Sequence, residues 1–151
     1  MNALPAPASP IAVVGWGRSG QGAAGALASR GFDVRAFDAK DGGTLHFDEA
    51  AGVPLSVEAD AGELADLVVG MRPAVVVVSP GVPPRSPVFA RARAAGIEVW
   101  GEVELAWRLQ EAGPRAGRPW LCVTGTNGKT TTVGMLGEIL RAGGADAAEV
   151  G

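Results

Sequence analysis

Short apolar runs alternate with helix-forming segments along most of the chain, and this alternation constrains the fold more than any other feature of the sequence. It is typical of α/β domains, in which helices cover both faces of a parallel sheet. The run at 74–78 contains four consecutive valines, as expected for a strand buried on both faces. We therefore predict a doubly wound, Rossmann-like parallel sheet. The predicted strands are 11–14, 34–37, 74–78 and 97–100, and the predicted helices are 21–30, 63–71, 88–95 and 103–110.

The pattern changes after residue 112. Residues 113–118 combine glycine, proline and arginine, a composition typical of a linker. Beyond it the sequence predicts one strand, at 120–123, and one helix, at 131–141, which together are too small to bury a core. We therefore expect an N-terminal fragment that stops inside its second domain. Its expected parts are a flexible leader (1–10), an α/β domain (11–112), a linker (113–118) and the incomplete start of a second domain (119–151).

Composition argues against several classes of protein. The 151 residues carry a net charge of −3, which gives no general attraction to nucleic acid or to an anionic membrane. Cys122 is the only cysteine, so an internal disulfide and a cysteine-based metal cluster are excluded. Within the predicted strand, Cys122 is expected to be a small buried residue. No signal peptide is recognisable, and no apolar run approaches the roughly 20 residues of a membrane span. We expect a cytoplasmic protein with no membrane insertion.

A glycine motif, Gly15-x-Gly17-x-x-Gly20, stands between the first predicted strand and the first predicted helix. Its glycines allow a tight turn and a close backbone approach, and a helix N-terminus presents free N–H groups to an anion. Asp38 ends the next strand, where a carboxylate can accept hydrogen bonds from a ribose or a base edge. The combination predicts a nucleotide site. The alternative is a glycine-rich helix start that serves packing alone.

A second glycine-containing loop, at 124–131, lies between the last predicted strand and helix and reads Thr-Gly-Thr-Asn-Gly-Lys-Thr-Thr. Backbone N–H groups of such a loop surround phosphates, Lys129 neutralises the β- and γ-phosphate oxygens, and Thr130 can bind Mg²⁺. Val123 stands where the full P-loop pattern has a glycine, which indicates a shorter subclass. The predicted ATP-binding residues are Gly125, Thr126, Asn127, Gly128, Lys129, Thr130 and Thr131, with Lys129 and Thr130 as catalytic residues and Thr130 as a magnesium ligand.

A third candidate segment, Ser79-Pro80-Gly81-Val82-Pro83, follows the most apolar predicted strand. Ligands of open α/β sheets bind beyond the carboxyl ends of the strands, so this segment is expected to line the nucleotide crevice. The alternative is a rigid turn that only ends the strand.

Taken together, these residues resemble the Mur ligases of peptidoglycan synthesis, and within that family the D-glutamate-adding branch. The resemblance covers nearly the whole chain after the leader, and the segment at 123–131 matches the family's ATP signature. It rests on Gly15-Trp16-Gly17-Arg18-Ser19-Gly20, Val78-Ser79-Pro80-Gly81-Val82, Ala94-Ala95-Gly96-Ile97-Glu98-Val99, Gly101-Glu102-Val103-Glu104-Leu105 and Val123-Thr124-Gly125-Thr126-Asn127-Gly128-Lys129-Thr130-Thr131.

The resemblance implies that the first domain holds the UDP part of a substrate instead of a dinucleotide. Arg18 and Ser19 would face the diphosphate, and Asp38 would lie near the uracil and ribose. Family members often carry a hydroxyl residue and an arginine where this chain has Ala39 and Lys40. The implied UDP-substrate residues are Gly17, Arg18, Ser19, Asp38, Ala39, Lys40, Ser79 and Gly81.

The reaction implied by the resemblance is ATP-dependent amide formation. The alanine carboxylate of UDP-N-acetylmuramoyl-L-alanine would form an acyl phosphate, which the amine of D-glutamate would then attack. ATP and Mg²⁺ would be required. The remaining magnesium-binding groups, a carbamylated lysine and the D-glutamate-binding domain of the family would lie beyond residue 151. We therefore expect the fragment alone to be inactive. The protein is expected to be a monomer.

Two other functions fit part of the sequence. An NAD-dependent oxidoreductase would account for the glycine motif at 15–20 and for Asp38, but it leaves the loop around Lys129 unexplained. A non-catalytic module would bind UDP or ATP and report to a partner without turnover.

Overall fold

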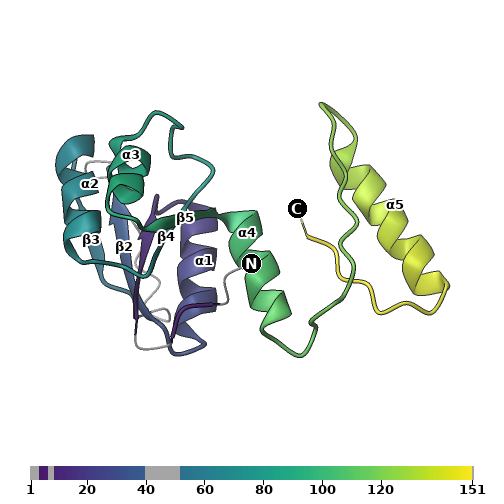
Figure 1. Cartoon of the computed structure of the whole chain (residues 1–151). Coiled ribbons are helices and arrows are strands. Elements are labelled where there is room, and N and C mark those ends of the chain that lie inside the picture. Colours follow the sequence, from purple (N-terminus) through teal and green to yellow (C-terminus); the bar gives the residue numbers. More distant parts are fainter. Residues whose placement is uncertain (1–3, 7–8, 40–51, 151) are drawn as a thin grey trace. The chain divides into compact units, whose positions relative to one another are not determined.

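The computed structural model describes residues 4–6, 9–39 and 52–150, and the chain divides into two units, Met1–Ala116 and Gly117–Gly151. The first unit contains a five-stranded sheet in the order β3-β2-β1-β4-β5, and every pair of neighbouring strands is parallel (Figure 1). The predicted parallel α/β fold is confirmed. The strands are β1 (Pro10–Val14), β2 (Asp33–Asp38), β3 (Leu55–Val57), β4 (Val75–Val78) and β5 (Glu98–Gly101).

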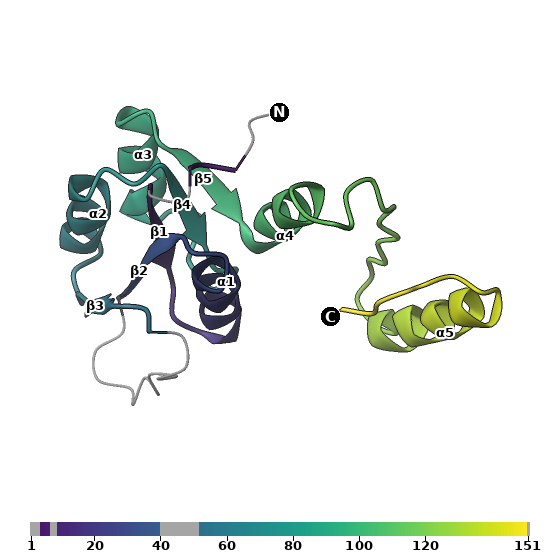
Figure 2. The same cartoon turned by 90° about the horizontal axis from the view of Figure 1, so that it is seen from below.

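Helices cover both faces of this sheet (Figure 2). On one face α1 and α4 bury Leu27 and Leu105 in one hydrophobic cluster, and on the other α2 and α3 bury Val68 and Val88 in a second cluster. None of the helices in the described ranges is long and apolar enough to cross a bilayer. The helices of the first unit are α1 (Arg18–Ala28), α2 (Ala61–Gly70), α3 (Pro87–Ala94) and α4 (Glu102–Glu111).

The two central strands, β1 and β4, are buried on both sides. Ile11 and Val13 belong to the cluster beneath α1 and α4, whereas Ala12 and Val14 belong to the opposite cluster. All four valines of β4 are buried in the same alternating way. Each buried valine side chain stabilises the fold by roughly 1.5–3 kcal/mol. The segments that leave the carboxyl edge of the sheet are therefore attached to well-packed, buried strands.

Local signals set the ends of the helices. Asp60 accepts hydrogen bonds at Oδ1 from the N–H groups of Gly62 (2.7 Å) and Glu63 (2.9 Å), which caps the start of α2. Pro87 begins α3, where a missing N–H is tolerated. Gly96 has a φ of +70° just after α3, a conformation that favours glycine at the end of a helix.

The second unit contains α5 (Lys129–Ala142), which begins two residues before the predicted helix. The strand predicted at 120–123 is absent. A strand needs a neighbour to pair its N–H and C=O groups, and residues 117–150 contain no strand that could serve. For the same reason Cys122 is exposed, so its predicted burial was wrong.

Candidate functional site

The order in which strands are added to the sheet reverses between β1 and β4. β2 and β3 lie on one side of this point, and β5 lies on the other. Ligands of open α/β sheets bind beyond the carboxyl ends of the strands at such a switch point. Two sequence-predicted segments leave the sheet here: residues 15–20, called the first glycine loop below, after β1, and Ser79 after β4.

Two glycines bring the start of α1 against the end of β1. Gly15 has a φ of +92°, and a Cβ on it would lie 3.0 Å from Ser79 Cβ and from Val82 Cγ2. A Cβ on Gly20 would lie 1.8 Å from the carbonyl oxygen of Gly15. The glycines therefore serve packing, as the alternative interpretation required. The same packing also holds the helix N-terminus at the carboxyl edge of the sheet.

The N-terminus of α1 suits an anion. Its N-cap residue is Gly17, no side chain caps the helix, and the first turn contains no acidic residue. The first N–H groups of a helix have no intrahelical acceptor and carry a partial positive charge. Gly17 and Arg18 are exposed and Ser19 is half-buried, so these predicted site residues are accessible to a ligand.

Two buried polar side chains hold the first glycine loop from the ends of β2 and β4. Asp38, 8% exposed, accepts a hydrogen bond at Oδ2 from the N–H of Trp16, with 2.6 Å between the atoms. Ser79, 9% exposed, donates from Oγ to the carbonyl oxygen of Gly15 at 2.7 Å. The ring of Trp16 is buried in the cluster beneath α1 and α4. Sequence reasoning identified both side chains but missed the backbone of Trp16, because no local pattern reveals a hydrogen bond across 22 positions.

The remaining residues implied for the UDP substrate are Ala39, Lys40 and Gly81. Ala39 follows β2 and is exposed, and Gly81 is exposed in a turn closed by the N–H of Val82, which donates to the carbonyl oxygen of Ser79 at 3.0 Å. Lys40 lies outside the described residues. The described members thus leave the carboxyl ends of β1, β2 and β4, which are neighbours in the sheet.

The second glycine loop, residues 124–131, leads into the N-terminus of α5. Gly128 has a φ of +76° and is the N-cap residue, and no side chain caps the helix. The Lys129 ammonium donates to the carbonyl oxygens of Gly125 at 2.6 Å and Thr126 at 3.4 Å, so it lies over its own loop. All seven predicted ATP-binding residues are exposed: Gly125, Thr126, Asn127, Gly128, Lys129, Thr130 and Thr131.

Thr130 was predicted to bind Mg²⁺, and it lies in the first turn of α5. Within the described part of the chain, no group of three His, Cys, Asp or Glu residues could hold a metal ion. Magnesium usually keeps several waters and is bound by one or two protein groups together with substrate phosphates. The Thr130 hydroxyl could be one ligand of a site of that kind, in which phosphate oxygens and water would supply most ligands.

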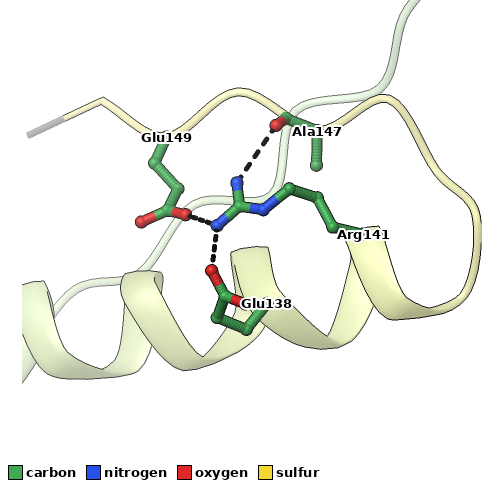
Figure 3. A network of polar contacts seen from close by, with 4 residues as sticks. All are labelled: Glu138, Arg141, Ala147 and Glu149. Atoms are coloured by element: carbon green, nitrogen blue, oxygen red, sulfur yellow. Dashed lines mark hydrogen bonds and ion pairs between the residues drawn. The ribbon is translucent and has the colours of Figure 1, made fainter.

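Arg141 joins the last turn of α5 to the segment that follows it (Figure 3). Its guanidinium contacts the carboxylates of Glu138 (2.7 Å) and Glu149, and it donates to the carbonyl oxygen of Ala147 (3.3 Å). Hydrogen bonds to Glu138 and then to Glu149 raise the pKa of Arg141 above its ordinary value. An arginine is charged at neutral pH in any case, so the raised pKa does not change its charge. The network connects α5 to the segment that follows it.

A cavity of about 500 Å³ lies between α3 and β5. Phe89, Ile97 and Val99 contribute apolar walls, and Arg93 and Glu98 contribute charge. None of the sequence-predicted site residues is among the residues that line it.

The geometry defines a Rossmann-like α/β domain whose switch point is suited to an anion. The chain belongs to the Mur ligase family: residues 9–101, more than half of its length, match the family described as Mur ligase MurD-like, N-terminal domain. The resemblance recognised in the sequence is confirmed.

Curated relatives extend the match into the second unit. The chain is 51% identical over 136 residues to a UDP-N-acetylmuramoylalanine–D-glutamate ligase of Frankia casuarinae, covering 89% of this chain and 27% of that protein. It is 43% identical over 141 residues to the ligase of the same name from Streptomyces coelicolor, covering 93% of this chain and 30% of the relative. The chain therefore spans less than a third of the length of these two relatives.

Solved structures support the fold. A UDP-N-acetylmuramate-alanine ligase from Thermotoga maritima matches with a TM-score of 0.53 and 26% identity, covering 88% of this chain and 29% of that one. A Neisseria UDP-N-acetylmuramate:L-alanyl-gamma-D-glutamyl-meso-diaminopimelate ligase matches with a TM-score of 0.56 and 24% identity, covering 91% of this chain and 40% of that one. The second likeness concerns the fold alone.

Proposed function

We propose that this chain is the N-terminal part of an ATP-dependent ligase that joins D-glutamate to UDP-N-acetylmuramoyl-L-alanine in peptidoglycan synthesis. One observation carries the proposal: a single chain presents two glycine loops, each leading into an uncapped helix N-terminus, and the second contains Lys129. The ligases named above as relatives support the identity of the substrates.

The first glycine loop is the proposed diphosphate site. The uncapped N–H groups at the start of α1 can donate to phosphate oxygens, and the exposed Arg18 adds a positive charge beside them. Ser19 can add a hydroxyl donor. A diphosphate carries enough negative charge to use all three groups at once.

The uracil and ribose are proposed to lie along the ends of β2 and β4. Asp38 and Ala39 leave β2, and Ser79 and Gly81 leave β4, next to the strand that leads into the diphosphate loop. Lys40 is included in the proposal from the sequence alone. This arrangement would hold the UDP end of the substrate in the first unit and leave its alanine carboxylate to be activated elsewhere.

The second glycine loop fits a triphosphate by its donor set. It combines backbone N–H groups at a helix N-terminus, the Lys129 ammonium, and the hydroxyl groups of Thr130 and Thr131. ATP would supply the phosphoryl group that activates the carboxylate, and Mg²⁺ would offset charge on the phosphate oxygens. Lys129 would stabilise negative charge on the transferring group, and Thr130 would hold the magnesium ion in place.

The test is phosphate release by the longer ligase that contains this chain, supplied with ATP and UDP-N-acetylmuramoyl-L-alanine. We expect release that depends on D-glutamate and matches the amide product in amount. Release at the same rate without D-glutamate, or binding of both nucleotides without turnover, would contradict the ligase and favour the nucleotide-sensing alternative.

A further inference from the structure

One peptide group in the first glycine loop is held at both ends by side chains from other strands. The carbonyl of Gly15 and the N–H of Trp16 belong to the same peptide bond. Ser79 donates to that carbonyl at 2.7 Å, and Asp38 accepts from that N–H at 2.6 Å. We infer that Asp38 and Ser79 form a peptide clamp that positions the first glycine loop for the diphosphate. This inference rests on the proposed function for its ligand.

The clamp fixes the orientation of the peptide plane. Glycine permits backbone rotations that other residues resist, and Gly15 already has a φ of +92°. Turning the Gly15–Trp16 peptide over would break both hydrogen bonds at once. It would also direct the Gly15 carbonyl at the Asp38 carboxylate. An ionised carboxylate accepts hydrogen bonds and has no proton to donate, so the two oxygens could not bond to each other. Each partner therefore favours the same orientation.

The clamp also determines which amides face an anion. Because the N–H of Trp16 is directed at Asp38, the groups left for a phosphate begin at Gly17 and continue through Arg18 and Ser19. A flipped peptide would turn the Trp16 N–H away from Asp38. It would also change the direction of the partial negative charge on the Gly15 carbonyl oxygen, next to these N–H groups. Asp38 and Ser79 thus act on the diphosphate through the backbone, as positioning residues.

Backbone hydrogen bonds between neighbouring strands hold the residues of the clamp beside one another. The N–H of Gly15 donates to the carbonyl oxygen of Phe37 at 2.8 Å, and the N–H of Ser79 donates to that of Val14 at 2.9 Å. A Cβ on Gly20 would lie 2.9 Å from Ser79 Oγ, so α1 begins close against the clamp. These contacts consequently join the carboxyl ends of β1, β2 and β4 to the start of α1.

The first test is a double-mutant cycle on the binding of UDP-N-acetylmuramoyl-L-alanine to the 151-residue chain, measured by calorimetry. We expect Asp38→Ala and Ser79→Ala each to weaken binding by about tenfold. Because both act on one peptide, the double variant should bind about as weakly as the weaker single variant. Independent direct contacts would multiply to about 100-fold, and that result would overturn the clamp. Asp33→Ala, on the exposed start of β2, and Ser86→Ala, before α3, are the matched controls and should bind normally.

The second test needs no ligand and reads the exchange rate of the Trp16 amide by NMR. Ser79→Ala should accelerate exchange although its side chain contacts the opposite end of the peptide. Asp38→Asn keeps an oxygen acceptor and should leave the amide protected, whereas Asp38→Ala should expose it. Unchanged Trp16 exchange in Ser79→Ala would overturn the clamp. Accelerated exchange in a chain that does not bind the UDP sugar would support the clamp and refute the proposed ligand.

Discussion

The two glycine loops reach similar helix N-termini by different means. The first glycine loop is held by residues distant in sequence, since Asp38 and Ser79 lie 22 and 64 positions from their partners. The second is held by Lys129, which contacts carbonyls only three and four positions away. The first glycine loop therefore takes its shape from the tertiary fold, whereas the second takes its shape from local contacts and is fully exposed.

This difference predicts how each loop responds to substitution. A change at a buried position of the first glycine loop, such as Gly20, should disturb the fold of its unit, because that position packs against the end of β1. A change in the second should alter chemistry with little effect on the fold, because its side chains face solvent. The following variants test that contrast, from the largest expected effect to the smallest.

Gly20→Ala should unfold or severely destabilise the first unit. The added Cβ would lie 1.8 Å from the carbonyl oxygen of Gly15, a backbone atom that cannot move freely. We expect a loss of more than about 4 kcal/mol in the free energy of unfolding, measured by urea denaturation. Gly22→Ala is the matched control, because a Cβ at Gly22 meets no atom within 4 Å. It should stabilise α1 by about 0.5–1 kcal/mol. Equal stability of the two variants would contradict the close packing at Gly20.

In the proposed longer ligase, Lys129→Ala should lower turnover by about 100-fold or more, equivalent to about 3 kcal/mol of transition-state stabilisation. Its urea midpoint should stay at the wild-type value, because Lys129 is exposed and its two hydrogen bonds among the described residues are to its own loop. Arg141→Ala, which removes a cation from the other end of α5, should retain nearly full turnover. Wild-type turnover in Lys129→Ala would remove the lysine from the mechanism.

In the proposed longer ligase, Asp38→Ala should weaken binding of the ligand of the first glycine loop and leave binding of the other ligand unchanged. We expect the affinity for UDP-N-acetylmuramoyl-L-alanine to fall by about tenfold, because the first glycine loop loses a buried acceptor. The affinity for ATP should not change. Both can be measured by calorimetry, and an equal loss of the two affinities would indicate a folding defect or a wrong assignment of the site.

Disrupting the network around Arg141 should have the smallest effect. Because these contacts are exposed, we expect Arg141→Ala to accelerate amide exchange in the segment after α5 without changing the unfolding midpoint of the first unit. High salt should do the same to the wild-type chain by screening the ion pairs. A shifted midpoint would show that the network also stabilises the first unit.

The central strands could be predicted from sequence because their apolar runs need no context to be recognised. β1 and β4 begin and end within one residue of the predicted bounds. β3 was missed because its three residues are too few for an alternating pattern, and its pairing with β2 supplies what its own sequence lacks. The opposite error occurred at 120–123, where an apolar run has no strand to pair with in the described part of its unit.

Sequence reasoning picked out the residues of the candidate site but not the contacts between them. Glycine spacing located the turn after β1, and the polar residues that end β2 and β4 indicated a crevice. The spacing could not show that Asp38 is directed at the Trp16 amide, because this contact forms only when β2 lies beside β1. It also could not show that Ser79 reaches the same peptide from the opposite neighbour, β4.

Thermal unfolding of the 151-residue chain with UDP-N-acetylmuramoyl-L-alanine, and in parallel with NAD, tests most directly whether the first glycine loop belongs to a UDP-sugar site. A ligand present at about 100 times its Kd stabilises the folded state by about 2.7 kcal/mol, which raises Tm by several degrees. We expect this shift with the UDP sugar and no shift with NAD. A shift with NAD alone, or no shift with the UDP sugar, would contradict the assignment.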